Sequence, residues 1–142
     1  YFPTDINALM DLDAERYPDV KVEIELLQKW DRKSGIENVG AGFFSVVAHE
    51  VYKAYGSEKR VITKTEIVEL IRKSKSFMIK HFGSTEKPLG EVQKLVRGGK
   101  AIPLPNLPDV LAAMYTREWK DGISKGIAGD SYIQLVKYEN GK

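Results

Sequence analysis

The chain contains no cysteine, which excludes disulfide bonds and thiolate metal sites and leaves the redox compartment open. It also lacks an excess of charge, because 22 basic residues face 20 acidic ones and the formal net charge is +2. This balance gives no argument for a nucleic acid or an anionic membrane as a partner. No apolar run approaches the roughly 20 residues that a membrane-spanning helix needs. We therefore expect neither nucleic acid nor membrane among its partners.

The 142 residues include 42% hydrophobic and 30% charged residues, a composition typical of a globular domain with one core of moderate size. The pattern changes after Gly83, where proline and glycine begin to interrupt short apolar runs. We predict an α+β fold, with a helical part over residues 1–84 and a loop-rich β part over residues 85–142.

Three main helices are expected in the first part. The first opens at Pro18 and ends at residues 31–33. The second starts with a capping box at residues 34–37 (Ser-Gly-Ile-Glu), in which the serine hydroxyl accepts from the third backbone N–H and the glutamate reaches back. The third starts with the same box at residues 63–66 (Thr-Lys-Thr-Glu) and stops at Gly83.

Two glycines, Gly40 and Gly42, fall inside the second predicted helix. Each costs about 1 kcal/mol relative to alanine in a helix interior. We interpret them as positions where a neighbouring element comes close to the helix backbone.

In the second part, the sequence predicts extended segments. Residues 89–96 fit either a short helix or a strand, while the prolines make residues 101–105 extended. Residues 109–115 and 129–138 are the strand candidates, with a turn at residues 121–122 between them. Alternation along the later run indicates a strand covered on both faces, in which Ile133 and Leu135 are buried.

A search for catalytic or ligand-binding patterns finds none that is complete. His49 has Lys53 rather than a second metal ligand four residues on, so it is interpreted as a packed or surface histidine, while His81 suits the dipole in the last turn of the third helix. Residues 97–100 (Arg-Gly-Gly-Lys) fit a solvated hairpin tip better than an anion site. Ser131 lacks the Gly-x-Ser-x-Gly turn of an exposed nucleophile. We predict no catalytic, cofactor-binding or metal-ligating residue.

Paired carboxylates could in principle share acid–base work if their surroundings separated their pKa values. Glu23 and Glu25, like the acidic residues between 11 and 15, have no apolar shielding that the sequence reveals. Acid–base catalysis therefore has no support from these residues.

Five stretches, in order, resemble motifs of the penicillin acylase family. Residues 26–31 and 39–44 are similar to its "L-x-x-W-D … G-A-x-L-F" pattern. Residues 89–99 look like its "W-G-x-V-x-R-L-x-R-G" segment, with leucine where tryptophan is usual. Residues 104–111 resemble "P-V-x-G-x-P-D-V-L", and residues 128–136 (Ala-Gly-Asp-Ser-Tyr-Ile-Gln-Leu-Val) resemble the "G-D-S-Y-I/V-x-x-V" strand.

The resemblance implies an N-terminal-nucleophile amidohydrolase, in which a self-cleaved precursor exposes a serine whose own α-amine serves as base. An α-amine suits this role because its pKa lies near 8, well below that of lysine. The family's nucleophile, oxyanion-hole residues and structural calcium ligands lie upstream of the matched motifs, and Tyr1 offers a phenol instead of the required hydroxyl. No residue here inherits a catalytic role, and we expect no cofactor in this chain.

On this resemblance, the chain is expected to be a C-terminal structural portion of an acylase. The parent enzyme would hydrolyse acyl amides of the β-lactam side-chain or N-acyl-homoserine lactone type, in the periplasm or outside the cell. Its partners would be the remainder of the acylase and the small acyl amide. The alternative is a self-contained α+β binding or interaction module without catalysis.

Overall fold

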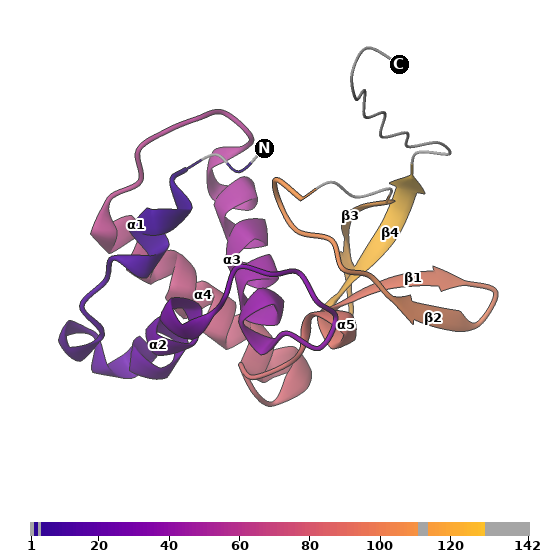
Figure 1. The fold of residues 1–142 in the computed structure, drawn as a ribbon, viewed down its shortest axis with the longest axis horizontal. Coiled ribbons are helices and arrows are strands. Elements are labelled where there is room, and N and C mark those ends of the chain that lie inside the picture. Colours follow the sequence, from indigo (N-terminus) through magenta and orange to yellow (C-terminus); the bar gives the residue numbers. More distant parts are fainter. Residues whose placement is uncertain (1, 3, 111–113, 130–142) are drawn as a thin grey trace, which may run out of the picture.

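The computed structural model describes residues 2, 4–110 and 114–129 (Figure 1). Five helices and four strands lie in this part, and the helices precede the sheet, so the predicted α+β class is confirmed. The helices are α1 Ile6–Met10, α2 Lys21–Lys29, α3 Val39–Tyr55, α4 Lys64–Phe82 and α5 Leu89–Val92. The strands are β1 Gln93–Arg97, β2 Lys100–Pro103, β3 Met114–Lys120 and β4 Ile123–Gly129. Short 3₁₀ turns at Ala14–Arg16 and Pro18–Val20 lead into α2.

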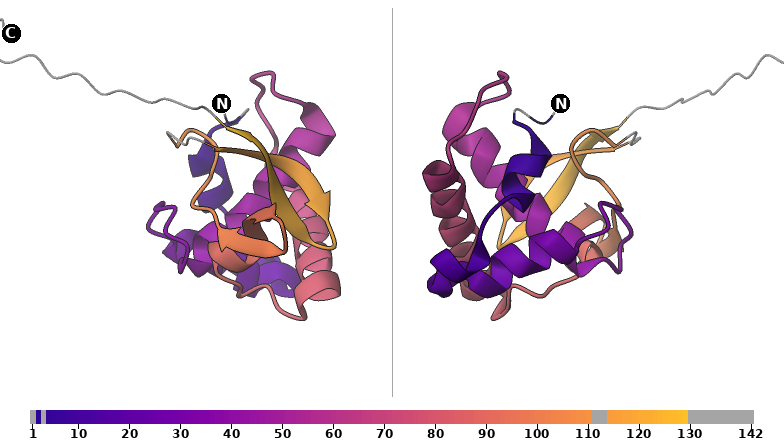
Figure 2. Two further views of the ribbon diagram at one scale, coloured as in Figure 1. Left: turned by 90° about the vertical axis from the view of Figure 1, so that its right-hand side faces the viewer. Right: turned by 60° about the vertical axis from the view of Figure 1, so that its left-hand side comes forward.

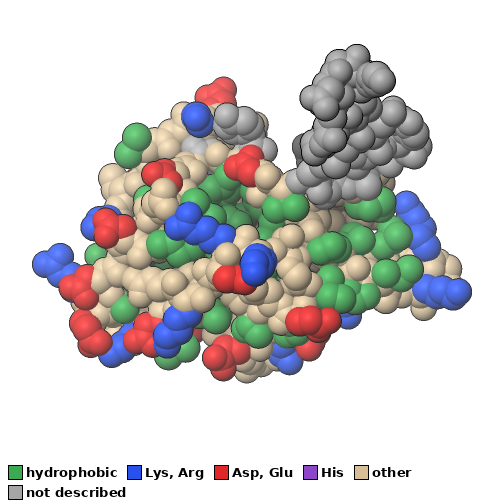
Figure 3. All heavy atoms as spheres, in the orientation of Figure 1, with side chains coloured by type: hydrophobic (Ala, Val, Ile, Leu, Met, Phe, Trp, Pro, Cys, Tyr) green, Lys and Arg blue, Asp and Glu red, His purple; other side chains and the backbone are tan. Residues whose placement is uncertain are grey.

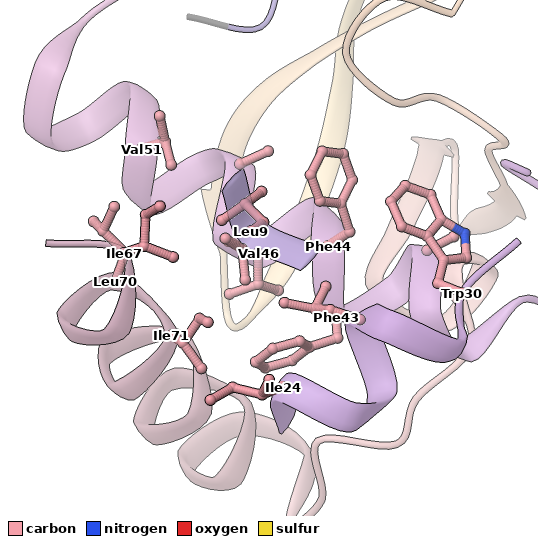
Figure 4. Packing of buried hydrophobic residues seen from close by; sticks show 14 of the residues in the cluster. Leu9, Ile24, Trp30, Phe43, Phe44, Val46, Val51, Ile67, Leu70 and Ile71 are labelled. Atoms are coloured by element: carbon pink, nitrogen blue, oxygen red, sulfur yellow. The ribbon is translucent and has the colours of Figure 1, made fainter. Parts of the chain in front are cut away.

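Helix α3 lies at the centre of the helical part. Every residue from 40 to 48 is buried, as expected for a helix with neighbours on all sides. Figure 4 shows Phe43 and Val46 of α3 pointing into the space that Ile24 of α2 and Ile71 of α4 also enter. One hydrophobic cluster joins the two predicted parts, because the β part contributes three of its members. These are Leu89, Val92 and Leu107.

Helix α4 begins and ends as its sequence predicts. The Thr63 hydroxyl accepts from the Glu66 backbone N–H, and the Glu66 carboxylate accepts from the Thr63 N–H at 2.8 Å. Gly83 then takes the left-handed conformation, with φ of 71°, and donates to the Ile79 carbonyl. The second capping box is therefore confirmed.

The predicted start of the second helix at Ser34 is wrong. Helix α3 begins at Val39, and the Asn38 side chain accepts from the Ala41 N–H at 2.9 Å. The Asn38 amide also donates to Asp31 at 2.8 Å, which fixes the cap. The backbone just before α3 forms hydrogen bonds with a distant segment. The Ile36 carbonyl accepts from the N–H of residue 90, and the Asn38 carbonyl accepts from the N–H of residue 89. These long-range bonds hold residues 36–38 outside the helix.

The sheet has the order β2-β1-β4-β3 and lies to one side of the helices (Figure 2). Two antiparallel hairpins, β1–β2 and β3–β4, are joined by a short parallel pairing of β1 with β4. Gly98 and Gly99 form the first hairpin turn with positive φ angles, so residues 97–100 are a hairpin tip as predicted. Asp121 and Gly122 form the second turn, also with positive φ.

The predicted strand positions need correction. Residues 89–96 combine both alternatives, since α5 ends at Val92 and β1 follows directly. Asp109 lies in a turn with φ of 61°, and strand β3 starts only at Met114. The strand predicted over 129–138, with Ile133 and Leu135, lies outside the described residues apart from Gly129 at the end of β4.

The sequence analysis did not predict strand β4, because glycines interrupt this segment. Gly126 lies inside β4 and pairs with Thr116. A Cβ there would lie 3.3 Å from side-chain carbons of both Leu95 and Leu104, so close packing on one face of the sheet explains the glycine.

Within the described part of the chain, no helix is both long and apolar enough to cross a membrane.

The caps give the first testable prediction. Asn38→Ala and Thr63→Ala should each lower the free energy of unfolding by about 1 kcal/mol, because each removes the acceptor of a helix N-terminal N–H. Ser34→Ala is the matched control and should change it by less than about 0.5 kcal/mol. Urea denaturation of the three variants measures this. A loss at Ser34 as large as that at Asn38 would contradict the observed helix start.

Candidate functional site at the junction of helices and sheet

Four of the five motif segments are linked by a series of contacts that runs from α2 through α3 and α5 to β1. Residues 26–31 form the end of α2, residues 39–44 the first turns of α3, and residues 89–99 form α5, β1 and the hairpin turn. Residues 104–110 form the loop after β2. The fifth segment, residues 128–136, lies outside the description beyond Gly129, and so does Ser131. We call the four linked segments the motif junction.

Trp30 links the first two segments of the motif junction. Its ring stacks on that of Phe44, with 4.6 Å between centroids and 29° between planes. The indole N–H, Nε1, donates to the Lys33 carbonyl at 3.0 Å, which satisfies its polar end. A Cβ on Gly40 would lie 2.5 Å from the Trp30 Cβ, so only glycine allows this approach.

The second and third segments meet through their backbones. A Cβ on Gly42 would lie 2.0 Å from the Lys87 carbonyl oxygen, so the chain entering α5 runs directly against α3. Leu89 donates its N–H to Asn38 at 3.0 Å, and Gly90 donates to Ile36 at 2.8 Å. The prediction that Gly40 and Gly42 admit close neighbours is therefore confirmed, and the neighbours are Trp30 and the 87–89 segment.

A buried amide connects the third and fourth segments to β3. Gln93, at the start of β1, is 3% exposed. Its Nε2 donates to the Asn106 carbonyl, and its Oε1 accepts from the Thr116 hydroxyl at 2.8 Å. The backbone carbonyl of Gln93 also accepts from Leu104 at 3.1 Å. These bonds satisfy the buried amide and hold the 104–110 loop across the sheet.

Glu23 is a buried acid that the sequence analysis missed. It is 3% exposed, in contrast to the unshielded pair expected with Glu25. One carboxylate oxygen accepts from Lys75 Nζ and the other from the Thr85 hydroxyl, both at 3.2 Å. Its spacing from Val20 and Leu27 placed it in the apolar stripe of the helix, a signal that could have revealed its burial. Both oxygens are engaged, so the group ties together α2, α4 and the loop after α4.

The two histidines lie away from the motif junction, where the β3–β4 hairpin meets the helices. The half-buried His49 ring on α3 lies 4.8 Å from that of Trp119 on β3. His81, at the end of α4, packs against the Phe77 ring at 4.6 Å. Burial lowers the pKa of His49, while the nearby Glu50 opposes the shift. His49 is thus packed against an aromatic ring.

Two open hollows lie on the described surface, and the larger, of about 910 Å³, is lined by Phe2, Arg60 and Asp109 among others. The smaller, of about 560 Å³, lies between α3 and α4 and is lined by Lys53, Arg72 and Phe77 among others. Arg72 is already bonded to Asp19 and Glu69. Among the described residues there is no group of three or more side chains that could hold a metal ion. The motif junction is therefore a packing site, and its polar groups bind one another.

Comparison with sequence models of protein families and with curated protein sequences gives no match for this chain. The family resemblance consequently depends on the quoted motifs and on how the fold arranges them.

The close approach at Gly42 gives the second prediction. Gly42→Ala should lower the free energy of unfolding by about 3 kcal/mol, because the new methyl group meets a backbone oxygen that cannot move without shifting α5. Gly35→Ala is the matched control, since a Cβ there meets nothing within 4 Å and the change should be small. Thermal and urea melts compare the two. Equal stability of both variants would contradict the approach of residue 87 to α3.

Proposed function

We propose that this chain is a structural portion of a penicillin-acylase-like amidohydrolase, with the catalytic serine supplied by another part of the protein. The parent enzyme would hydrolyse acyl amides of the β-lactam side-chain or N-acyl-homoserine lactone type, in the periplasm or outside the cell. The observation that carries the proposal is the motif junction, at which four separate stretches resembling the family pack on one another.

The residue contacts explain why these motifs would recur together. Trp30 and Phe44 belong to different motifs and stack directly, while Gly40 makes room for the indole. Gly42 makes room for the backbone that leads into the third motif, whose Gly90 bonds to residue 36. Three contacts thus join different motifs directly: Trp30 with Gly40 and Phe44, Gly42 with the Leu89 backbone, and Gln93 with the loop after β2.

The surface of the β part supports a further protein partner. Five of the exposed large hydrophobic residues described lie in or next to the sheet, at 36–54% exposure. They are Val96, Ile102, Val110, Tyr115 and Ile127. Figure 3 shows hydrophobic side chains among the surface atoms on this side of the molecule. In the proposed enzyme, the remainder of the acylase would cover these groups.

The chemistry of the proposed reaction requires a free N-terminal hydroxyl residue, with its α-amine as base, and donors for the oxyanion. The described residues offer histidines in aromatic contacts and a buried glutamate whose oxygens are both bonded. In the proposed enzyme, this chain has a structural role, and the portion that bears the nucleophile catalyses the hydrolysis.

A self-contained binding or interaction module is the second candidate. The observation that favours it is the single hydrophobic core, which joins the helices and the β part among the described residues. The two candidates differ in what the parent reading frame encodes. An acylase requires an upstream serine at a self-cleavage junction, whereas a module does not.

The third prediction is that the purified 142-residue chain does not turn over acyl amides. Removing one oxyanion donor typically lowers a rate by 10²–10³, and here the whole catalytic set would be missing. Penicillin G, an N-acyl-homoserine lactone and a chromogenic acyl anilide are the substrates. Turnover above buffer that disappears on substitution of His49, His81 or Ser131 would contradict the proposal and indicate a self-contained enzyme.

The positive test uses the full reading frame. We expect mass spectrometry to detect self-cleavage that leaves an N-terminal serine, and the mature protein to hydrolyse at least one of the three substrates. Gly42→Ala in that protein should reduce the mature, active fraction, while Gly35→Ala should leave it unchanged. A frame without an upstream serine and without hydrolysis would favour the binding module.

A further inference from the structure

The β3–β4 hairpin is an internally well-paired unit with a narrow attachment to the rest of the sheet. Six residue pairs align β3 with β4, but only two, Gln93 with Ser124 and Lys94 with Lys125, align β1 with β4. The Thr116 hydroxyl adds its bond to Gln93. Side-chain packing against the helices adds to this attachment.

That packing is built from aromatic rings of three elements. Trp119 of β3 lies 4.8 Å from His49 of α3 and, edge to face, 5.4 Å from Phe77 of α4. Phe77 in turn contacts His81 at 4.6 Å. The hairpin turn rests on His81, because a Cβ on Gly122 would lie 2.5 Å from the His81 Cβ. The only two histidines of the chain thus lie under the same hairpin.

The charges around His49 come from several elements. Glu50 and Lys53 of α3 act on it with opposite sign, and they form an ion pair at 3.7 Å. Arg72 and Lys73 of α4 line the hollow that these two residues share with Phe77. On the hairpin, Lys120 and Asp121 follow Trp119 at the turn. Arg72 is paired with Asp19 and Glu69, and of the two charges that act on His49, Glu50 raises its pKa and Lys53 lowers it.

We infer that the His49–Trp119–Phe77 contact is a proton-sensitive latch, which holds the β3–β4 hairpin on α3 and α4 while His49 is neutral and releases it on protonation. The ring face of Trp119 would attract an imidazolium. Burial of the half-covered imidazole opposes this attraction and favours the neutral form. The inference does not depend on the proposed function.

The direction of the pH effect follows from linkage. In the released hairpin His49 is open to water, with a pKa near the ordinary value of about 6.5, whereas in the docked state its pKa is lower. Docking is therefore at full strength above pH 6.5 and weakens as the pH falls toward the docked pKa. Below that pKa both states are protonated and the effect levels off. One proton changes the docking equilibrium at most tenfold per pH unit.

Amide hydrogen exchange tests the latch. After correction for intrinsic rates, protection of residues 114–129 should fall up to tenfold per pH unit below about pH 6.5, while protection of α4 stays constant. His49→Phe keeps a ring without a proton site, so its hairpin protection should not change with pH. His81→Gln is the matched control and should retain the pH dependence. An NMR titration of the His49 imidazole should give a pKa below 6.5.

Three results would overturn the latch. The first is equal protection of the hairpin at pH 7.5 and 5.0 in the unmodified chain. The second is a fall in His49→Phe as large as in the unmodified chain. The third is a His49 pKa above 6.5, which would mean that the indole attraction exceeds burial and that acid tightens the contact. If His49→Phe does not fold, the imidazole titration and the exchange profile of the unmodified chain decide.

Discussion

The close packing around helix α3 holds α2, α4 and α5 together. Because residues 40–48 are buried on all sides, α3 meets α2, α4 and the chain entering α5 within its first three turns. Two of those contacts are possible only without a side chain, at Gly40 and Gly42. The two glycines weaken the isolated helix by about 1 kcal/mol each. The apolar area buried around them offsets this loss, since each fully buried large side chain contributes about 1.5–3 kcal/mol.

Features that depend on local spacing were predictable from the sequence. The Thr63 capping box, the Gly83 stop and the hairpin turns all follow from residues within four positions of one another. The start of α3 was not predictable in this way. Ser34 and Glu37 have the capping spacing, but the carbonyls of residues 36 and 38 bond to a segment some fifty residues away. Hydrogen bonds to a distant segment therefore outweigh the local capping-box spacing in setting the start of α3.

At the motif junction, local features were again predictable and long-range contacts were not. The need for a close neighbour at Gly40 and Gly42 could be predicted, because glycine inside a helix has an energetic penalty that requires a reason. The identity of each neighbour could not be predicted, because Trp30 and residue 87 reach the helix only through the tertiary fold. Glu23 was missed for a different reason. Its charge suggested solvent, whereas its position in the helical stripe indicated burial with a partner, Lys75.

The parallel pairing of β1 with β4 has a consequence for the order of folding. Each hairpin closes over a two-residue turn, a local event on a timescale of about 1–10 μs. The β1–β4 pair instead joins Gln93 to Ser124, so its two partners must meet across the intervening chain and over a larger loop-closure entropy. In the folded sheet, the bonds of Gln93 to Asn106 and Thr116 hold two intermediate points of this connection beside β1. Loss of the Gln93 side chain would therefore leave the two pairs of β1 with β4 as the main backbone link between the hairpins.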